Sequence, residues 1–183
     1  MGPGLRRDDI EFCGGVPPMT PHLRSGVIAG IAALVLDQAT KLWLLFVFEI
    51  ARRGVVKVTP FFDLVLAWNV GISFGWFQND SFLAQAVLTA IKAVAVIVLA
   101  IWMARSHNWL ATVALGLIIG GAIGNAIDRV AYGAVVDFAL FHLQIGEITY
   151  NWYVFNLADV AIVAGVAALL YDSFLGLPAA KAP

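Results

Sequence analysis

Four stretches of the chain are long and apolar enough to cross a lipid bilayer, and this feature limits the possible folds more than any other. Crossing the hydrocarbon core takes about 20 residues of helix, at about 1.5 Å per residue. The four stretches cover residues 25–48, 82–103, 109–127 and 155–175. We therefore expect a mainly α membrane protein with four transmembrane helices and no separate soluble domain.

Composition supports a membrane location. Hydrophobic residues make up 61% of the chain and charged residues 13%, whereas soluble domains have about 45–50% and about 25%. The net charge is −1 and no Lys/Arg run exceeds two residues, so we expect no nucleic-acid partner. Cys13 is the single cysteine and cannot form an internal disulfide.

The two ends of the chain differ from its centre. Residues 1–23 are polar and rich in Gly and Pro, and Arg6 and Arg7 precede acidic residues instead of an apolar core. That order does not fit a secretory signal, and we expect a flexible tail. Residues 176–183 form a short C-terminal tail, which leaves residues 24–175 as the membrane domain.

The segments between the spans have their own character. VVKVT (55–59) and FFDLVLAW (61–68) are rich in β-branched and aromatic residues, which predicts short strands of a small sheet at the membrane surface, within the loop 49–81. The segment 128–154 is mixed and is expected to form a loop or helix. It ends in aromatics that favour the lipid headgroup level: Tyr150, Trp152 and Tyr153.

Positive charge gives a weak indication of orientation. Arg24 and Arg105 fall on one side of the membrane and favour a cytoplasmic location for it, although Arg52, Arg53 and Lys57 lie on the other. Both termini would then be cytoplasmic.

The unusual polar residues of the chain fall on one membrane face. With four spans, one side of the membrane must hold these segments: the end of the first span, the loop 49–81, the end of the third span, the loop 128–154 and the start of the fourth span. A charge costs about 2.5–3.5 kcal/mol near the centre of a membrane helix, so such residues are seldom kept without partners or a task. The sequence therefore predicts one polar site, made of Asp37, Lys41, Asn69, Gly71, Asn125, Asp128, Arg129, Asp137, Asn156 and Asp159.

Two carboxylates are the best candidates for chemistry at this site. Two aspartates held close share one proton, so that one accepts a proton from water while the other polarises a carbonyl. Asp128 is followed by Arg129 and shares a helix face with Asn125, which indicates a positioning cluster. Asp137 and Asp159 lie in apolar strings without an adjacent cation, and burial there would raise their pKa values.

Each of these signals also has a structural interpretation. Asp37 and Lys41, at i and i+4, fit a buried ion pair. Asn125, Asp128 and Arg129 fit a cap for the third span. Asp159 fits a first-turn acid that the helix dipole favours.

Other kinds of site are less well supported. The three histidines, His22, His107 and His142, are too scattered for a metal-site pattern, so no metal is expected. Ser73 and Lys41 share the right face for a serine–lysine hydrolase, but Asp37 should keep the lysine charged. A small proton-coupled transporter could use Asp37, Asp159 and Lys92 as a relay, yet no internal repeat is visible.

Five sequence blocks resemble those of the lipoprotein signal peptidase (signal peptidase II) family of intramembrane aspartyl proteases. They occur in the family's order, within residues 24–175: DQATK (37–41), NVGISF (69–74), GNAIDR (124–129), VVDF (135–138) and FNLAD (155–159). The resemblance implies four transmembrane helices with a periplasmic β-cradle at 49–81 and a second periplasmic element at 128–154. It also implies an inner-membrane endopeptidase that removes the signal peptide of diacylglyceryl-modified prolipoproteins, just before the lipidated cysteine.

The resemblance further implies roles for individual residues. Asp137 and Asp159 match the family's catalytic aspartates. It implies no cofactor, a lipid-modified prolipoprotein substrate, contact with membrane lipids, and inhibition by globomycin-type peptides. The residues matching substrate-binding or supporting positions are Asn69, Gly71, Phe74, Asn125, Asp128, Arg129, Asn156, Asp37 and Lys41.

Overall fold

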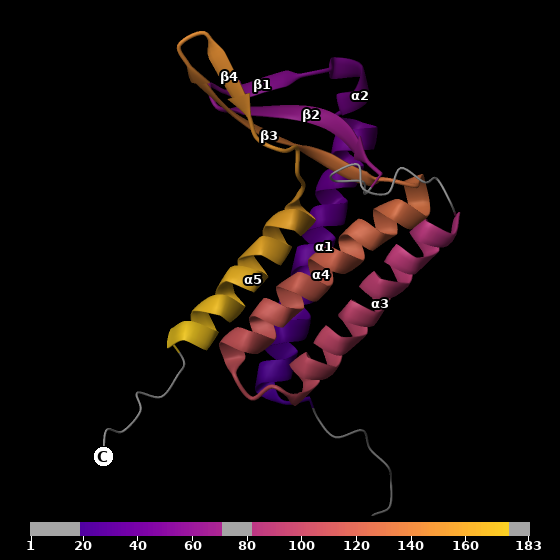
Figure 1. The fold of residues 1–183 in the computed structure, drawn as a ribbon, viewed down its shortest axis with the longest axis vertical. Helices are drawn as coiled ribbons and strands as arrows, with labels where there is room; N and C mark the ends of the chain where they lie inside the picture. Colours follow the sequence, from indigo (N-terminus) through magenta and orange to yellow (C-terminus); the bar gives the residue numbers. More distant parts are fainter. Residues whose placement is uncertain (1–18, 71–81, 176–183) are drawn as a thin grey trace, which may run out of the picture.

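A computed structural model describes residues 19–70 and 82–175 as a bundle of long helices with a small sheet at one end (Figure 1). Its helices are α1 (Pro21–Leu42), α2 (Ile50–Arg53), α3 (Phe82–Arg105), α4 (Trp109–Tyr132) and α5 (Leu157–Leu175), with a π-helical turn η2 (Trp43–Val47) after α1. Its strands are β1 (Val56–Thr59), β2 (Phe62–Asn69), β3 (Val135–Ile145) and β4 (Ile148–Asn151).

Within the described residues, three helices are long and apolar enough to cross a membrane: Pro21–Val47, Trp109–Tyr132 and Leu157–Phe174. Ala93–Arg105, within α3, is apolar but shorter than a full span. The expected mainly helical membrane fold with a small sheet is thus confirmed, while the fourth span remains a prediction.

Helix boundaries differ from those expected, for local reasons. α1 begins at Pro21, inside the segment assigned to the tail, because the Thr20 side chain accepts a hydrogen bond from the Leu23 backbone N–H at 3.2 Å and Pro suits the first turn. α4 continues to Tyr132, five residues beyond the expected end of the third span, and Asn125, Asp128 and Arg129 lie in its last turns, as their spacing predicted. Gly133, with φ 74°, ends α4 and lets the chain enter β3 two residues later.

Glycines allow α1 and α4 to approach closely. On α1, Gly26 and Gly30 are four residues apart, as are Gly116 and Gly120 on α4. Gly26 faces Gly116, and Gly30 faces Gly120. A Cβ on Gly116 would overlap the Gly26 carbonyl oxygen, and one on Gly120 would overlap the Gly30 carbonyl oxygen. Lipid provides no hydrophobic force between helices, so van der Waals contact between close backbones contributes to their association.

The sheet joins two loops that are distant in sequence. Its order is β1-β2-β3-β4, with antiparallel pairing throughout. The segment 128–154, expected as a loop or helix, instead forms β3 and β4. β3 pairs with β2 of the first loop, with Ala67 opposite Asp137. An apolar cluster of Leu44, Ile50, Phe138 and Ala139 packs the sheet against the end of the first span.

Candidate active site

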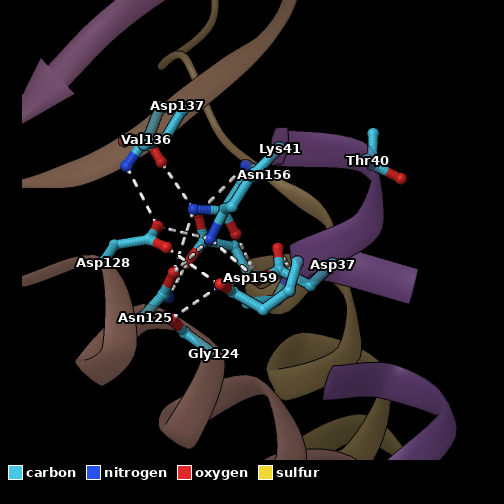
Figure 2. Close-up of polar contacts among 12 residues, drawn as sticks. Asp37, Thr40, Lys41, Gly124, Asn125, Asp128, Val136, Asp137, Asn156 and Asp159 are labelled. Atoms are coloured by element: carbon cyan, nitrogen blue, oxygen red, sulfur yellow. Dashed lines mark hydrogen bonds and ion pairs between the residues drawn. The ribbon is translucent and has the colours of Figure 1, made fainter. Parts of the chain in front are cut away.

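A buried lysine lies between two aspartates and forms an ion-paired cluster in the site (Figure 2). The Lys41 Nζ lies 2.8 Å from Asp37 Oδ2 and 2.7 Å from Asp128 Oδ2, and all three side chains are at most 2% exposed. The expected i,i+4 pair of Asp37 and Lys41 is present, and Asp128 on α4 joins it. Buried charges are tolerated when they are paired and hydrogen-bonded, which is the case here.

The two aspartates also bind backbone groups of the neighbouring elements. The Ala158 N–H, in the first turn of α5, donates to Asp37 Oδ1 at 2.9 Å. The Val136 N–H, next to Asp137 on β3, donates to Asp128 Oδ2 at 3.1 Å. The cluster thereby fixes α1, α4, β3 and α5 relative to one another.

Gln38 is a member of this cluster that the sequence reasoning missed. Its Nε2 donates to Asp128 Oδ1 at 2.9 Å and to the Gly124 carbonyl oxygen at 3.1 Å, joining α1 to α4. The residue lies inside the DQATK block, but its place directly after Asp37 gives no shared helix face. The signal that could have found it is an amide within an apolar span, which needs a partner.

Two asparagines connect the charged cluster to the remaining aspartates. The Asn156 Nδ2 donates to Asp137 Oδ1 at 2.6 Å and to Asn125 Oδ1 at 3.0 Å. The Asn125 Nδ2 in turn donates to Asp159 Oδ1 at 2.9 Å, and its Oδ1 also accepts from Lys41 at 3.2 Å. Asn156 is fully buried, so water cannot replace these partners. Only one orientation of its amide points the NH2 group at both acceptor oxygens.

Asp159 is held at the beginning of α5 by a reciprocal pair of hydrogen bonds. Its N–H donates to Asn156 Oδ1 at 2.9 Å, and its Oδ2 accepts from the Asn156 N–H at 3.2 Å. This arrangement is a capping box. The structural interpretation of Asp159 as a first-turn acid is therefore correct, and the same side chain also reaches the polar network through Asn125.

Asp137 is buried and electrostatically coupled to Asp159. Its Oδ2 accepts from the Asn69 Nδ2 at 3.0 Å, and its Oδ1 accepts from Asn156. Burial is the main cause that raises the pKa of Asp137; the hydrogen bond from Asn69 opposes it, and the negative charge of Asp159 adds to it. A carboxyl in this setting holds its proton more tightly than a free aspartate.

The structure thus brings most of the expected site residues into one network. Arg129 lies at its edge, where its guanidinium donates to the Asn125 carbonyl oxygen of its own helix at 3.2 Å. Gly71, Ser73 and Phe74, and the side chain of Lys92, lie outside the described residues. In the part of the chain that the structure describes, no group of three or more His, Cys, Asp or Glu side chains could hold a metal ion.

Comparison with known proteins identifies relatives over most of the chain. The family model described as signal peptidase (SPase) II matches residues 29–175. Proteins named lipoprotein signal peptidase from Nitrobacter hamburgensis and Rhodopseudomonas palustris are 74% and 73% identical over 165 residues, which are 90% of this chain and 100% of each relative.

Solved structures agree at the level of the fold. One described as a bacterial membrane enzyme superposes with a TM-score of 0.67 at 25% identity, over 82% of this chain and 92% of that chain. Residues 29–175, which the family model matches, contain every residue of the polar network described above. The chain therefore belongs to the signal peptidase (SPase) II family.

Proposed function

We propose that Asp137 and Asp159 act together as the catalytic pair of a lipoprotein signal peptidase. As a member of the signal peptidase II family, the chain is an aspartic-type protease that cleaves signal peptides from prolipoproteins. The observation that carries the proposal is Asn156, whose amide binds Asp137 while its backbone N–H binds Asp159. One residue thus holds both carboxyl groups at the junction of β3 and α5.

The chemistry follows from one proton shared between two carboxyl groups. The ionised carboxylate accepts a proton from water, and the hydroxyl formed attacks the scissile carbonyl carbon. The protonated carboxyl donates to the carbonyl oxygen, and a proton then passes to the departing amine as the C–N bond breaks. The raised pKa of Asp137 supports a pair that keeps one proton near neutral pH, and the pair titrates as a unit.

The surrounding residues position this pair. Asn125 and Asn156 orient the two carboxyl groups, and the cluster of Asp37, Lys41 and Asp128 fixes the elements that carry them. Asn69 contacts Asp137 from β2 and is proposed, with Gly71 and Phe74, to contact the substrate. We propose that cleavage occurs just before the diacylglyceryl-modified cysteine of the substrate.

We place the site near the periplasmic face of the inner membrane. In Figure 1 the sheet lies at one end of the bundle, and α3 runs beside α4 as a fourth helix of 24 residues. These features support four spans, which would put both termini on the same side of the membrane, and Arg24 and Arg105 at that end favour the cytoplasm. Membrane lipids and globomycin-type peptides are the further ligands that we propose.

The alternative function, a proton-coupled transporter, is not supported. The family model and the similar relatives are peptidases. The network around Asp137 and Asp159 also lies where the sheet meets the helices, whereas transporter sites are usually near the membrane midplane.

Neutralising either proposed catalytic carboxyl tests the function. Asp137→Asn and Asp159→Asn should each reduce prolipoprotein processing by at least about 100-fold, since general acid–base catalysis contributes about 10²–10⁴-fold. Processing of a lipidated substrate by purified protein in lipid measures this. Asp172→Asn, at the other end of α5, is the matched control and should keep normal turnover. Normal turnover in either proposed catalytic variant would refute the pair.

The raised pKa of Asp137 predicts an unusual effect on stability. A folded-state pKa above the unfolded value means that this carboxyl stabilises the fold fully below the unfolded pKa and loses that effect as pH rises. Asp137→Asn cannot ionise, but its side-chain NH2 loses one of the hydrogen bonds that Asp137 accepts from Asn69 and Asn156, at any pH. The melting temperature of the variant minus that of the parent, measured in detergent, should therefore be more favourable to the variant at pH 7 than at pH 4. A difference that is the same at both pH values, or more favourable to the variant at pH 4, would contradict this.

Substitution of Asp37 should affect folding more than chemistry. Asp37→Asn removes one carboxylate from Lys41 and weakens the bond to the Ala158 N–H, so we expect a lower yield of folded protein. Removing one partner of a buried pair costs about 3–5 kcal/mol. Folded yield and turnover per folded molecule are to be measured together. Full yield combined with abolished cleavage would show instead that Asp37 takes part in the reaction.

A further inference from the structure

Gln38 contacts both carboxylates that surround Lys41. Its Nε2 donates to Asp128 Oδ1 at 2.9 Å, to the Gly124 carbonyl oxygen at 3.1 Å and to Asp37 Oδ2 at 3.2 Å. All three neighbours are acceptors, so only the NH2 end of the amide can face them. Gln38 and Lys41, at i and i+3 of α1, thus approach the same two aspartates from one helix face.

The cluster around Lys41 holds more negative than positive charge. The carboxylates of Asp37 and Asp128 face one ammonium group, and all three side chains are at most 2% exposed. Buried carboxylates need hydrogen-bond donors in addition to their cation. Within the described residues, the neutral donors to these oxygens are one backbone N–H of α5, one backbone N–H of β3 and the amide of Gln38. Gln38 is the one among them that donates to both carboxylates.

Asp128 is the carboxylate that connects Gln38 to the proposed catalytic pair. Its Oδ2 accepts from the Val136 N–H at 3.1 Å, and Val136 directly precedes Asp137 on β3 (Figure 2). The same oxygen lies 2.7 Å from Lys41 Nζ. An aspartate turns readily about its last side-chain bond, whose torsion has broad minima. Because Gln38 holds Oδ1, Oδ2 stays directed at the lysine and at β3.

We propose that Gln38 is a positioning residue, whose amide fixes the Asp128 carboxylate and through it the part of β3 that carries Asp137. This role depends on the catalytic function proposed above for Asp137. Without the amide N–H groups, Asp128 is free to turn, its bond to the Val136 N–H weakens, and the Asp137 carboxyl shifts. A misplaced catalytic carboxyl slows the chemical step without weakening substrate binding.

Two substitutions separate the donor role of Gln38 from its size. Gln38→Met keeps the length of the side chain and removes the donor. Gln38→Glu keeps the shape, and its carboxyl donates an O–H to Asp128 only while it is protonated. Thr40→Val is the matched control on the same turn of α1, because the Thr40 hydroxyl donates to the Leu36 carbonyl oxygen of its own helix at 2.8 Å.

The kinetic test measures kcat and KM per folded molecule for cleavage of a lipidated prolipoprotein in lipid. Gln38→Met should lower kcat by roughly 10- to 100-fold and leave KM unchanged, because a misplacement of about 1 Å can cost about 10²-fold. For Gln38→Glu, the ratio of its kcat to that of the parent should fall as pH rises, since ionisation removes the donor. Thr40→Val should keep the parent values. If Gln38→Met does not fold, the pH trend of Gln38→Glu decides.

Hydrogen exchange at the Val136 amide gives a second readout that does not depend on activity. Exchange should be faster in Gln38→Met than in the parent and unchanged in Thr40→Val. Full kcat in Gln38→Met, a change in KM alone, unchanged exchange at Val136, or a Gln38→Glu ratio that is constant with pH would each overturn the proposal. Normal turnover in Asp137→Asn would instead refute the catalytic pair, and faster exchange in Gln38→Met would still support the link from Gln38 to β3.

Discussion

The ion-paired Lys41, placed between Asp37 and Asp128, is the interaction on which the rest of the site depends. A lone charge is costly in a membrane helix, and only the assembled fold provides both partners. The same two aspartates accept hydrogen bonds from the backbone of α5 at Ala158 and of β3 at Val136. The interactions that neutralise the lysine therefore also fix the two elements that carry Asp137 and Asp159.

The site is built in layers from α1 outwards. Glycines let α1 approach α4 closely enough for Lys41 to reach Asp128, and Asn125 and Asn156 extend the network from this charged layer to the second pair of aspartates. Charge is compensated in the first layer, where a cation is present. In the outer layer Asp137 and Asp159 accept hydrogen bonds from neutral amide and backbone N–H groups, and burial raises the pKa of the Asp137 carboxyl, which therefore retains its proton more readily.

Much of this arrangement could be predicted from local sequence. The spacing of Asp37 and Lys41 gave the ion pair, and the parity of the spans predicted that the polar residues would share one end of the bundle. The pairing of β2 with β3 could not be predicted, because strand partners far apart in sequence leave no local pattern. Gln38 was missed for a related reason: its partners, Gly124 and Asp128, lie on another helix. Gly71 and Phe74 lie outside the described residues and stay predictions.

The most direct test of the shared proton is the dependence of kcat on pH for cleavage of a lipidated prolipoprotein. A pair that works with one carboxyl protonated and the other ionised predicts a bell-shaped profile of kcat against pH. The rate falls at low pH, where the pair gains a second proton, and at high pH, where it loses the shared proton. The two limbs belong to the pair and not to either residue alone. A rate that rises to a plateau and stays there at high pH would contradict the account, since it would require only an ionised base.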